Sequence, residues 1–456
     1  MKIQKILNPI KGPNESITQM KKSYLHILLF FLGSFAPLYA QMSLEDALEI
    51  ALDQNLKLKI STNKVSAVQN TATFGQAGLL PYVSATGSSD YGNNSTQIEF
   101  AGDQDPLNAS SAQSLNLFTS LSATYTLFSG GAKINLFRKL RMDADLSSLK
   151  NRLDIESTIL SVVSAYSNVL RAKDNYQALF ESMNLSLERV CMAKKQKEFS
   201  GAGRSVLLNA EVDLNQDSVA SVQALQALKA AEISFNKLLN RDLTYEVSLQ
   251  NLPFLFSEIS DYAVLKQTML QQNAEVLTAR LNVQNSILSL KISKSSYLPQ
   301  LNLTGSYNFV RSETEGNFLT LNQSKGLGVL FSVSLPIYSG GTRNASLKNA
   351  KLDLLNNEWE LRETSLSMEA NLLKAFSEFE KAQLIVLMEE KNIILNKENL
   401  EYAKKYFVAG ILSSNEYRRA QINLLLVKNN LNNARYNLVL SEMEVLRLTG
   451  NLINRF

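Results

Sequence analysis

Two long stretches of the chain, 132–200 and 342–409, contain neither Pro nor Gly and carry apolar residues at seven-residue intervals. In the second stretch, Leu347, Leu354 and Leu361 follow this spacing. A seven-residue repeat predicts helices that pack side by side in a left-handed supercoil. Because a helix rises about 1.5 Å per residue, each stretch would reach roughly 100 Å, which no globular core spans. The pattern therefore predicts two very long helices in coiled-coil hairpins.

Four shorter segments alternate apolar and polar residues, the pattern of strands with two different faces. One face of each is apolar and uncharged, and the other is neutral and polar. Strands of this length cross a bilayer when tilted, although the edge of a soluble β-sandwich would show the same alternation. The stretches between paired strands, 92–116 and 310–326, are rich in Asn, Ser, Gly and acidic residues, as loops in water would be. The predicted strands are 82–91, 118–128, 301–309 and 327–335.

The same order of elements occurs twice along the chain. The dipeptide Leu-Pro stands at 80–81 and 298–299, and Ser-Gly-Gly stands at 129–131 and 339–341. Such ordered landmarks predict a tandem duplication, with one structural repeat at 41–245 and a second at 246–456. Each repeat would hold a first helix, a strand pair, a long helix, a turn and a last helix. The first helices are expected at 43–78 and 261–297.

The N-terminal segment 1–40 has the composition of an export signal. Lys21 and Lys22 precede an apolar run that ends in small residues at Ala40. This order predicts a signal peptide cleaved after Ala40, with Met20 as a possible true start. The run is shorter than the ~20 apolar residues that a membrane-spanning helix needs.

The composition excludes several kinds of chemistry. His26 is the only His, and it would leave with the signal peptide, so neither imidazole catalysis nor a His-ligated metal site is expected. Cys191 is the only Cys; it can form no intrachain disulfide and is expected to be a small apolar residue packed on a helix. Basic and acidic residues balance outside the N-terminal segment, which argues against nucleic acid as a partner.

Four strands cannot close a barrel, and open sheet edges are not tolerated in lipid, so several chains would have to contribute. Two chains would supply about eight strands and three about twelve, and only the larger barrel leaves an open lumen. The small polar residues on one strand face favour the larger barrel.

The signal peptide, the duplicated order of elements, the Leu-Pro before each strand pair and the Ser-Gly-Gly after it together resemble the TolC-like outer membrane efflux proteins, or outer membrane factors. The resemblance implies a mixed α and β fold: a homotrimer whose 12-stranded transmembrane β-barrel lies in outer-membrane lipid and continues into a periplasmic α-helical barrel. It implies a conduit with no enzymatic activity and no cofactor.

The resemblance also implies partners, namely a periplasmic adaptor protein and an inner-membrane pump of a tripartite efflux or type I secretion system. The alternative from another class is a secreted or periplasmic coiled-coil scaffold without a pore. In that scaffold, the alternating segments would form a soluble hairpin.

By the same resemblance, the turns at 199–205 and 407–414 form the periplasmic entrance and the adaptor-docking tip. Glycines there supply the left-handed backbone that ends a helix. The best-known member closes its entrance with polar bonds, but the matching positions here hold Phe407, Leu412 and Arg419 in place of Tyr, Arg and Asp. Arg419 is expected either to form a basic ring at the mouth or to pair with Glu416 one helical turn away. The candidate residues are Gly201, Gly203, Ser205, Val206, Phe407, Gly410, Leu412, Glu416 and Arg419.

Overall fold

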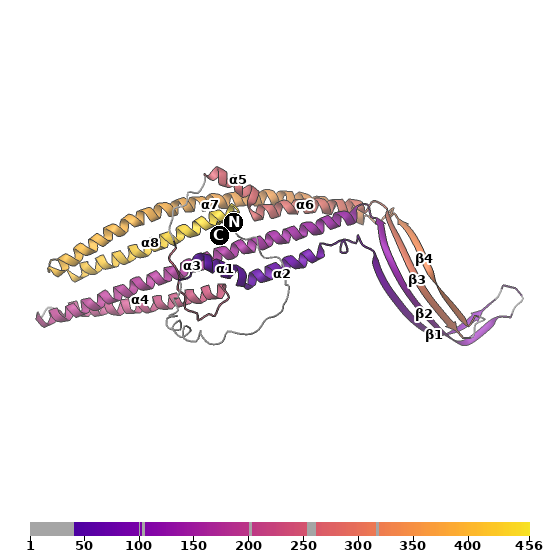
Figure 1. Ribbon diagram of the computed structural model, residues 1–456, viewed down its shortest axis with the longest axis horizontal. Coiled ribbons are helices and arrows are strands. Elements are labelled where there is room, and N and C mark those ends of the chain that lie inside the picture. The colour runs from indigo at the N-terminus through magenta and orange to yellow at the C-terminus, as the bar shows by residue number, and fades with distance from the viewer. Residues whose placement is uncertain (1–40, 100, 103–104, 200–202, 253–260, 316–318) are drawn as a thin grey trace, which may run out of the picture.

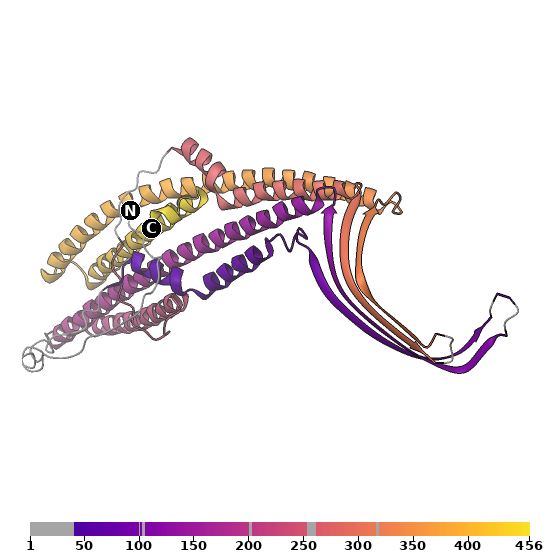
Figure 2. The same ribbon diagram turned by 45° about the vertical axis from the view of Figure 1, so that its right-hand side comes forward.

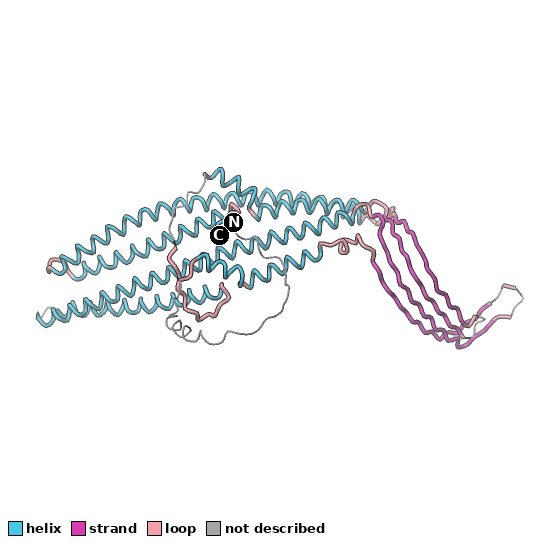
Figure 3. Tube along the Cα trace, viewed as in Figure 1, coloured by secondary structure: helices cyan, strands magenta, loops and turns pink. Residues whose placement is uncertain are grey.

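The computed structural model describes residues 41–456 except 100, 103–104, 200–202, 253–260 and 316–318. The molecule is strongly elongated, with its helices at one end and its strands at the other (Figures 1 and 3). The C-terminus lies about midway along the helical part (Figure 1). The predicted signal peptide falls outside the described residues.

Each half of the chain contributes two short helices, two strands and two long helices. The long helices α3 and α7 have 68 and 67 residues, which confirms the two unbroken helices that the seven-residue pattern predicted. None of the helices in the described part of the chain is long and apolar enough to cross a membrane. The elements are α1 (Leu44–Gln54), α2 (Leu56–Thr71), β1 (Tyr82–Ile98), β2 (Leu107–Phe128), α3 (Ala132–Phe199), α4 (Gly203–Leu238), α5 (Tyr262–Gln272), α6 (Ala274–Ser295), β3 (Gln300–Thr314), β4 (Leu321–Ser334), α7 (Thr342–Val408), α8 (Ser414–Leu448) and a short 3-10 helix (Ile453–Arg455).

The first helix of each repeat is broken in two, which corrects the single helices expected at 43–78 and 261–297. The Asn55 side chain accepts hydrogen bonds from the N–H groups of the next helix and donates one to the carbonyl oxygen of Leu238, at 3.0 Å. Asn273 does the same in the second half and donates to Leu448, also at 3.0 Å. Each Asn therefore caps a new helix and ties it to the end of the last helix of its own repeat.

The two repeats also match at the far end of the helices. Ala193 and Ala210 are buried between α3 and α4, and Ala403 and Ala420, each 210 positions later, are buried between α7 and α8. Small residues at these matched positions let the paired helices approach closely. The predicted duplication is thus visible as two hairpins in the same register.

The four strands form one antiparallel sheet in the order β1-β2-β3-β4, and the sheet is bent along its length (Figure 2). All four strands extend into the stretches predicted to be loops. Past Phe309 and Leu327, the apolar face carries Arg311, Glu313 and Lys325, so the alternation ends although the backbone pairing continues. The predicted strands therefore match the part of β3 and β4 whose apolar face is uncharged, together with the part of β1 and β2 that pairs beside it.

Neutral side chains on the polar face of the sheet link neighbouring strands. Hydroxyl and amide groups on neighbouring strands form hydrogen bonds between side chains, and none of the pairs is charged. The described pairs are Ser84–Ser122 at 3.2 Å, Ser120–Asn308 at 2.7 Å, Thr124–Thr304 at 3.2 Å, Thr126–Asn302 at 2.8 Å and Asn116–Ser312 at 2.5 Å. The opposite face is the apolar one.

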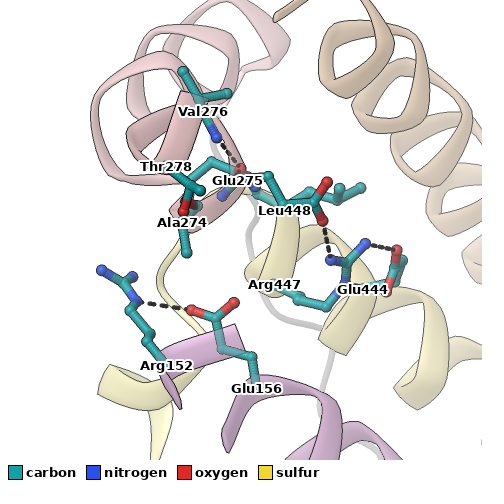
Figure 4. A network of polar contacts seen from close by, with 10 residues as sticks. Arg152, Glu156, Ala274, Glu275, Val276, Thr278, Glu444, Arg447 and Leu448 are labelled. Atoms are coloured by element: carbon teal, nitrogen blue, oxygen red, sulfur yellow. Dashed lines mark hydrogen bonds and ion pairs between the residues drawn. The ribbon is translucent and has the colours of Figure 1, made fainter. Parts of the chain in front are cut away.

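The largest core lies midway along the helices, where α1, α3, α4 and α8 meet around Tyr166 and Phe235. A charged network borders this core (Figure 4). Arg152 contacts the buried carboxylate of Glu156 at 2.9 Å and donates a hydrogen bond to the Gly450 carbonyl at 2.8 Å. Arg447 bonds Glu444 at 2.7 Å and Glu275 at 3.4 Å. The network joins α3, α6 and α8, which belong to different repeats.

Candidate site at the tips of the helical hairpins

The α7–α8 turn is a compact, well-bonded hairpin end. Gly410 has φ +74°, and a Cβ at this position would have no atom within 4 Å. The N–H groups of Ile411 and Leu412 bond the Tyr406 carbonyl at 3.0 and 3.2 Å, which satisfies the end of α7. Ser413 then begins α8 with a capping box in which Glu416 accepts hydrogen bonds from the Ser413 N–H and hydroxyl.

Two of the candidate residues at this tip are packing residues. The Phe407 ring stacks on Tyr417 with centroids 5.0 Å apart, and Leu412 packs beside them. Phe407 thus holds the two helices together through an aromatic contact that does not depend on hydrogen bonds.

The structure does not contain the expected pairing of Glu416 with Arg419. The Glu416 carboxylate is occupied by Ser413, and the hydrogen bond from that hydroxyl is the main reason that its pKa is lowered. Arg419 is exposed in a shallow groove between α7 and α8 beside Tyr402 and Tyr406, and it forms no ion pair with any described residue. Whether Arg419 forms a basic ring remains a prediction, because a ring needs other chains.

The candidate residues of the first hairpin lie at the start of α4. Gly203 begins α4, Ser205 is exposed, and Val206 packs against Val190 and Ala193 of α3. Gly201 lies outside the described residues. Cys191 on α3 is exposed, so the prediction of a packed residue was wrong: its neighbours Val190 and Ala193 face α4, whereas Cys191 points to another side of the helix.

A polar cluster that the sequence analysis missed lies slightly farther from the tip, where α8 meets α3 and α4. Arg418 pairs with Asp217 at 2.6 Å, and the two side chains are only 12% and 11% exposed. The same guanidinium donates hydrogen bonds to Ser186 at 3.1 Å and Ser182 at 3.3 Å. Ser186 in turn donates to Asp217 at 2.5 Å. We call Arg418, Asp217, Ser182 and Ser186 the arginine cluster.

A second ion pair lies one turn closer to the tip. Arg189 of α3, with a side chain that is 2% exposed, contacts Asp213 of α4 at 3.0 Å. It also donates a hydrogen bond to the Ser414 hydroxyl of α8 at 3.2 Å. Together, the arginine cluster and the Arg189 pair fasten the second hairpin to the first near the tip.

A signal for this site was present in the sequence. Asp213 and Asp217 are one turn apart on one helix, as are Ser414 and Arg418 on another. Polar or charged residues at positions i and i+4 lie on the same face of a helix. Where that face packs against another helix, they indicate a polar interface. The sequence could not show that the two pairs face each other, since that depends on how the hairpins are aligned in space.

Comparison with known proteins supports the fold and its membrane setting. Residues 265–451 match the family model described as outer membrane efflux protein. The chain is 21% identical over 403 residues to the proteases secretion protein PrtF of Dickeya chrysanthemi, covering 85% of each protein. It is 22% identical over 302 residues to the outer membrane protein TolC of Vibrio cholerae, covering 65% of this chain and 68% of that protein.

Solved structures have the same fold along nearly the whole chain. The Campylobacter jejuni CmeC outer membrane channel superimposes with a TM-score of 0.76 at 18% identity, covering 96% of this chain and 94% of CmeC. The outer membrane protein VceC of Vibrio cholerae gives 0.72 at 14% identity, covering 89% and 96%. The strands accordingly lie in the outer membrane and the helices extend into the periplasm. The second half of the chain thus matches the outer membrane efflux protein family, and the chain as a whole resembles proteins of this kind in sequence and fold.

Proposed function

We propose that this chain forms a homotrimeric channel that carries substrates from the periplasm or an inner-membrane pump to the cell exterior. Three chains would supply the twelve strands of a barrel whose polar face lines the lumen. The channel would catalyse no reaction. The alternative, a soluble scaffold without a pore, would leave the long apolar face of the sheet exposed to water.

The observation that carries the proposal is that each side of the chain leaves exposed apolar side chains on its helices and a strand with a free edge. Within the chain, β2 pairs with β3 and α3 packs on α6 and α8, which joins the two repeats. This leaves β1, α2 and α4 on one side and β4 and α7 on the other (Figure 1). Exposed apolar side chains follow both sides: Tyr82, Val83, Leu56, Ile60, Leu208 and Val219 on the first, and Leu327, Val329, Leu352, Leu366, Leu384 and Met388 on the second.

Two different sides that need covering favour a ring. Head-to-tail contact between them closes into a cyclic oligomer, and it also pairs the free edge of β1 with that of β4. Trimer formation therefore satisfies the sheet edges and covers the apolar helix faces in one step.

The tips are the proposed docking site for an adaptor. Val408 and Ile411 are 76% and 72% exposed at the end of the second hairpin, next to the open space around Gly410. An apolar tip at this distance from the membrane would suit the end of a partner helical hairpin. The name of the relative PrtF favours protein secretion, whereas the name of the matching family favours efflux. We therefore propose an adaptor and a pump as partners but do not assign the substrate.

We also assign the closing of the entrance to the arginine cluster and the Arg189 pair. They join the two hairpins of a chain beside the α7–α8 turn, where Ser414 accepts a hydrogen bond from Arg189. In this proposal, these bonds hold the entrance closed in place of the polar bonds that Phe407 and Leu412 cannot form.

Fractionation and mass measurement test the proposal. The protein should be recovered with outer membranes, be released only by detergent, and have the mass of a trimer by native mass spectrometry. It should conduct ions in a planar bilayer. A monomer recovered from the soluble periplasm would refute the channel and favour the scaffold.

A further inference from the structure

The internal duplication indicates how neighbouring chains meet. Inside a chain, α8 of the second repeat packs on α3 of the first. In a ring, α4 of the next chain would take the place of α8, and α7 would take the place of α3. The buried alanines Ala193, Ala210, Ala403 and Ala420 show that the two hairpins share a register offset of 210 positions. A contact between α3 and α8 would therefore have an equivalent between α7 of one chain and α4 of the next, 210 positions away on both partners. This step rests on the proposed trimer.

Between the largest core and the tip, the interface of α3 with α8 within the chain is polar. Besides the arginine cluster and the bond from Arg189 to Ser414, polar and charged side chains of the two helices bond each other along this part. The pairs are Lys428–Glu181 at 3.0 Å, Asn429–Asn175 at 3.1 Å, Tyr436–Asp174 at 2.9 Å and Arg171–Asn437 at 3.2 Å.

The equivalent interface between chains has a different chemistry. Val219 of α4 and Ile385 of α7 occupy the positions equivalent to Asn429 and Asn175, and Leu208 replaces Arg418. None of the equivalent positions brings opposite charges together. Both helices carry apolar stripes at heptad-like spacing that are exposed in the single chain: Leu208, Val212, Val219 and Val222 on α4, and Leu384, Met388 and Leu395 on α7.

We infer that the entrance opens along the polar interface within each chain, while the apolar interface between α7 of one chain and α4 of the next stays closed. Water can replace the hydrogen bonds of separated polar groups, so the polar interface loses little when it parts. Separated apolar stripes have no such replacement, and their cost grows with exposed area. The moving unit would consist of α7–α8 of one chain and α3–α4 of its neighbour.

Two matched cysteine pairs test this inference in the purified full-length channel, with Cys191→Ser removing the native thiol. The first pair, Asn175→Cys with Asn429→Cys, spans the interface within a chain. The second, Val219→Cys with Ile385→Cys, is its equivalent between chains. Both pairs are placed in an Arg418→Gln background, which is expected to open the channel, and are joined by a short bifunctional thiol reagent.

We expect linkage of the first pair to lower the planar-bilayer conductance at least about tenfold, back to the level of the channel with Arg418. Linkage of the second should leave the conductance unchanged and produce covalent trimers on a denaturing gel. Closure by the second pair, or no change with the first, would overturn the inference. So would a trimer by native mass in which the second pair does not link, since the α7–α4 register would then be wrong. A protein that is not trimeric at all would instead refute the proposed channel.

Discussion

Replacing Arg418 with Gln should open the channel entrance. Arg418 is the only cation among the described residues that pairs with Asp217. The variant keeps a side chain of similar length that can still bond Ser182 and Ser186, but it leaves the Asp217 carboxylate without a counter-charge in a site that is 11% exposed. The loss is therefore electrostatic rather than steric.

The magnitude follows from the burial of the pair. Removing one partner of a buried ion pair costs about 3–5 kcal/mol, and we take about 3 because the serine hydroxyls still bond Asp217. Three chains would together lose roughly 9 kcal/mol of closed-state stability if the sites are independent. About 5.5 kcal/mol is enough to move an equilibrium from 1:99 to 99:1, so the open state should become the major one.

Single-channel conductance in a planar bilayer measures this change directly. Lys404→Gln is the matched control: it removes a positive charge near the same tip, from a side chain of α7 that is exposed and forms no ion pair with a described residue. We expect high conductance for Arg418→Gln and the native value for Lys404→Gln. An Arg418→Gln trimer of native mass and helix content that conducts no better than the control would refute the reasoning.

Three further predictions concern other parts of the molecule. Gly410→Trp should abolish export in cells but leave the trimer and its membrane insertion intact, because the turn lies far from the sheet and has open space; loss of the trimer would contradict this placement. If Arg419 forms a basic ring, the channel should prefer anions in reversal-potential measurements, and a cation preference that Arg419→Ala leaves unchanged would exclude the ring. Burial raises the pKa of Glu156 above its ordinary value, against the opposing effect of Arg152, so this carboxyl adds stability as the pH falls through its folded-state pKa towards 4.5. The melting temperature of the native protein should exceed that of Glu156→Gln by more at pH 5 than at pH 7. An equal change of melting temperature in both proteins between the two pH values would contradict the assignment.

The sequence predicted well those features that arise from local patterns. The long helices follow from heptads without Pro or Gly, and the predicted segment of each strand follows from the alternation of apolar and polar residues. Asn55 and Asn273 escaped notice because an Asn within a helical pattern is ambiguous: only the neighbouring carbonyl groups of Leu238 and Leu448 show that each side chain ends one helix and begins another. Strand pairing beyond Phe309 was missed for a related reason, since water on both faces removes any alternation.

The entrance was harder to predict because its chemistry depends on the alignment of two hairpins. At the turn itself, the residues that the family resemblance singled out contribute packing and capping. The charges that hold the hairpins together belong to Arg418 and Arg189, one to three turns away, and their partners lie on helices more than 200 positions apart in the sequence or across a hairpin. Residues matched by their distance from a glycine turn do not reveal such an interface.

The neutral pairs on the polar face of the sheet have a consequence for whatever moves past them. Because Thr124 bonds Thr304 and Ser120 bonds Asn308, much of the hydrogen-bonding capacity of this wall is already used by the wall itself. A solute gains little by leaving its water shell to adhere at these pairs, and Asp90, in register with Asn116 of the Asn116–Ser312 pair, is a carboxylate on the same face. Solutes should therefore bind this face only weakly, so that their passage along it depends on their size and on their diffusion through water.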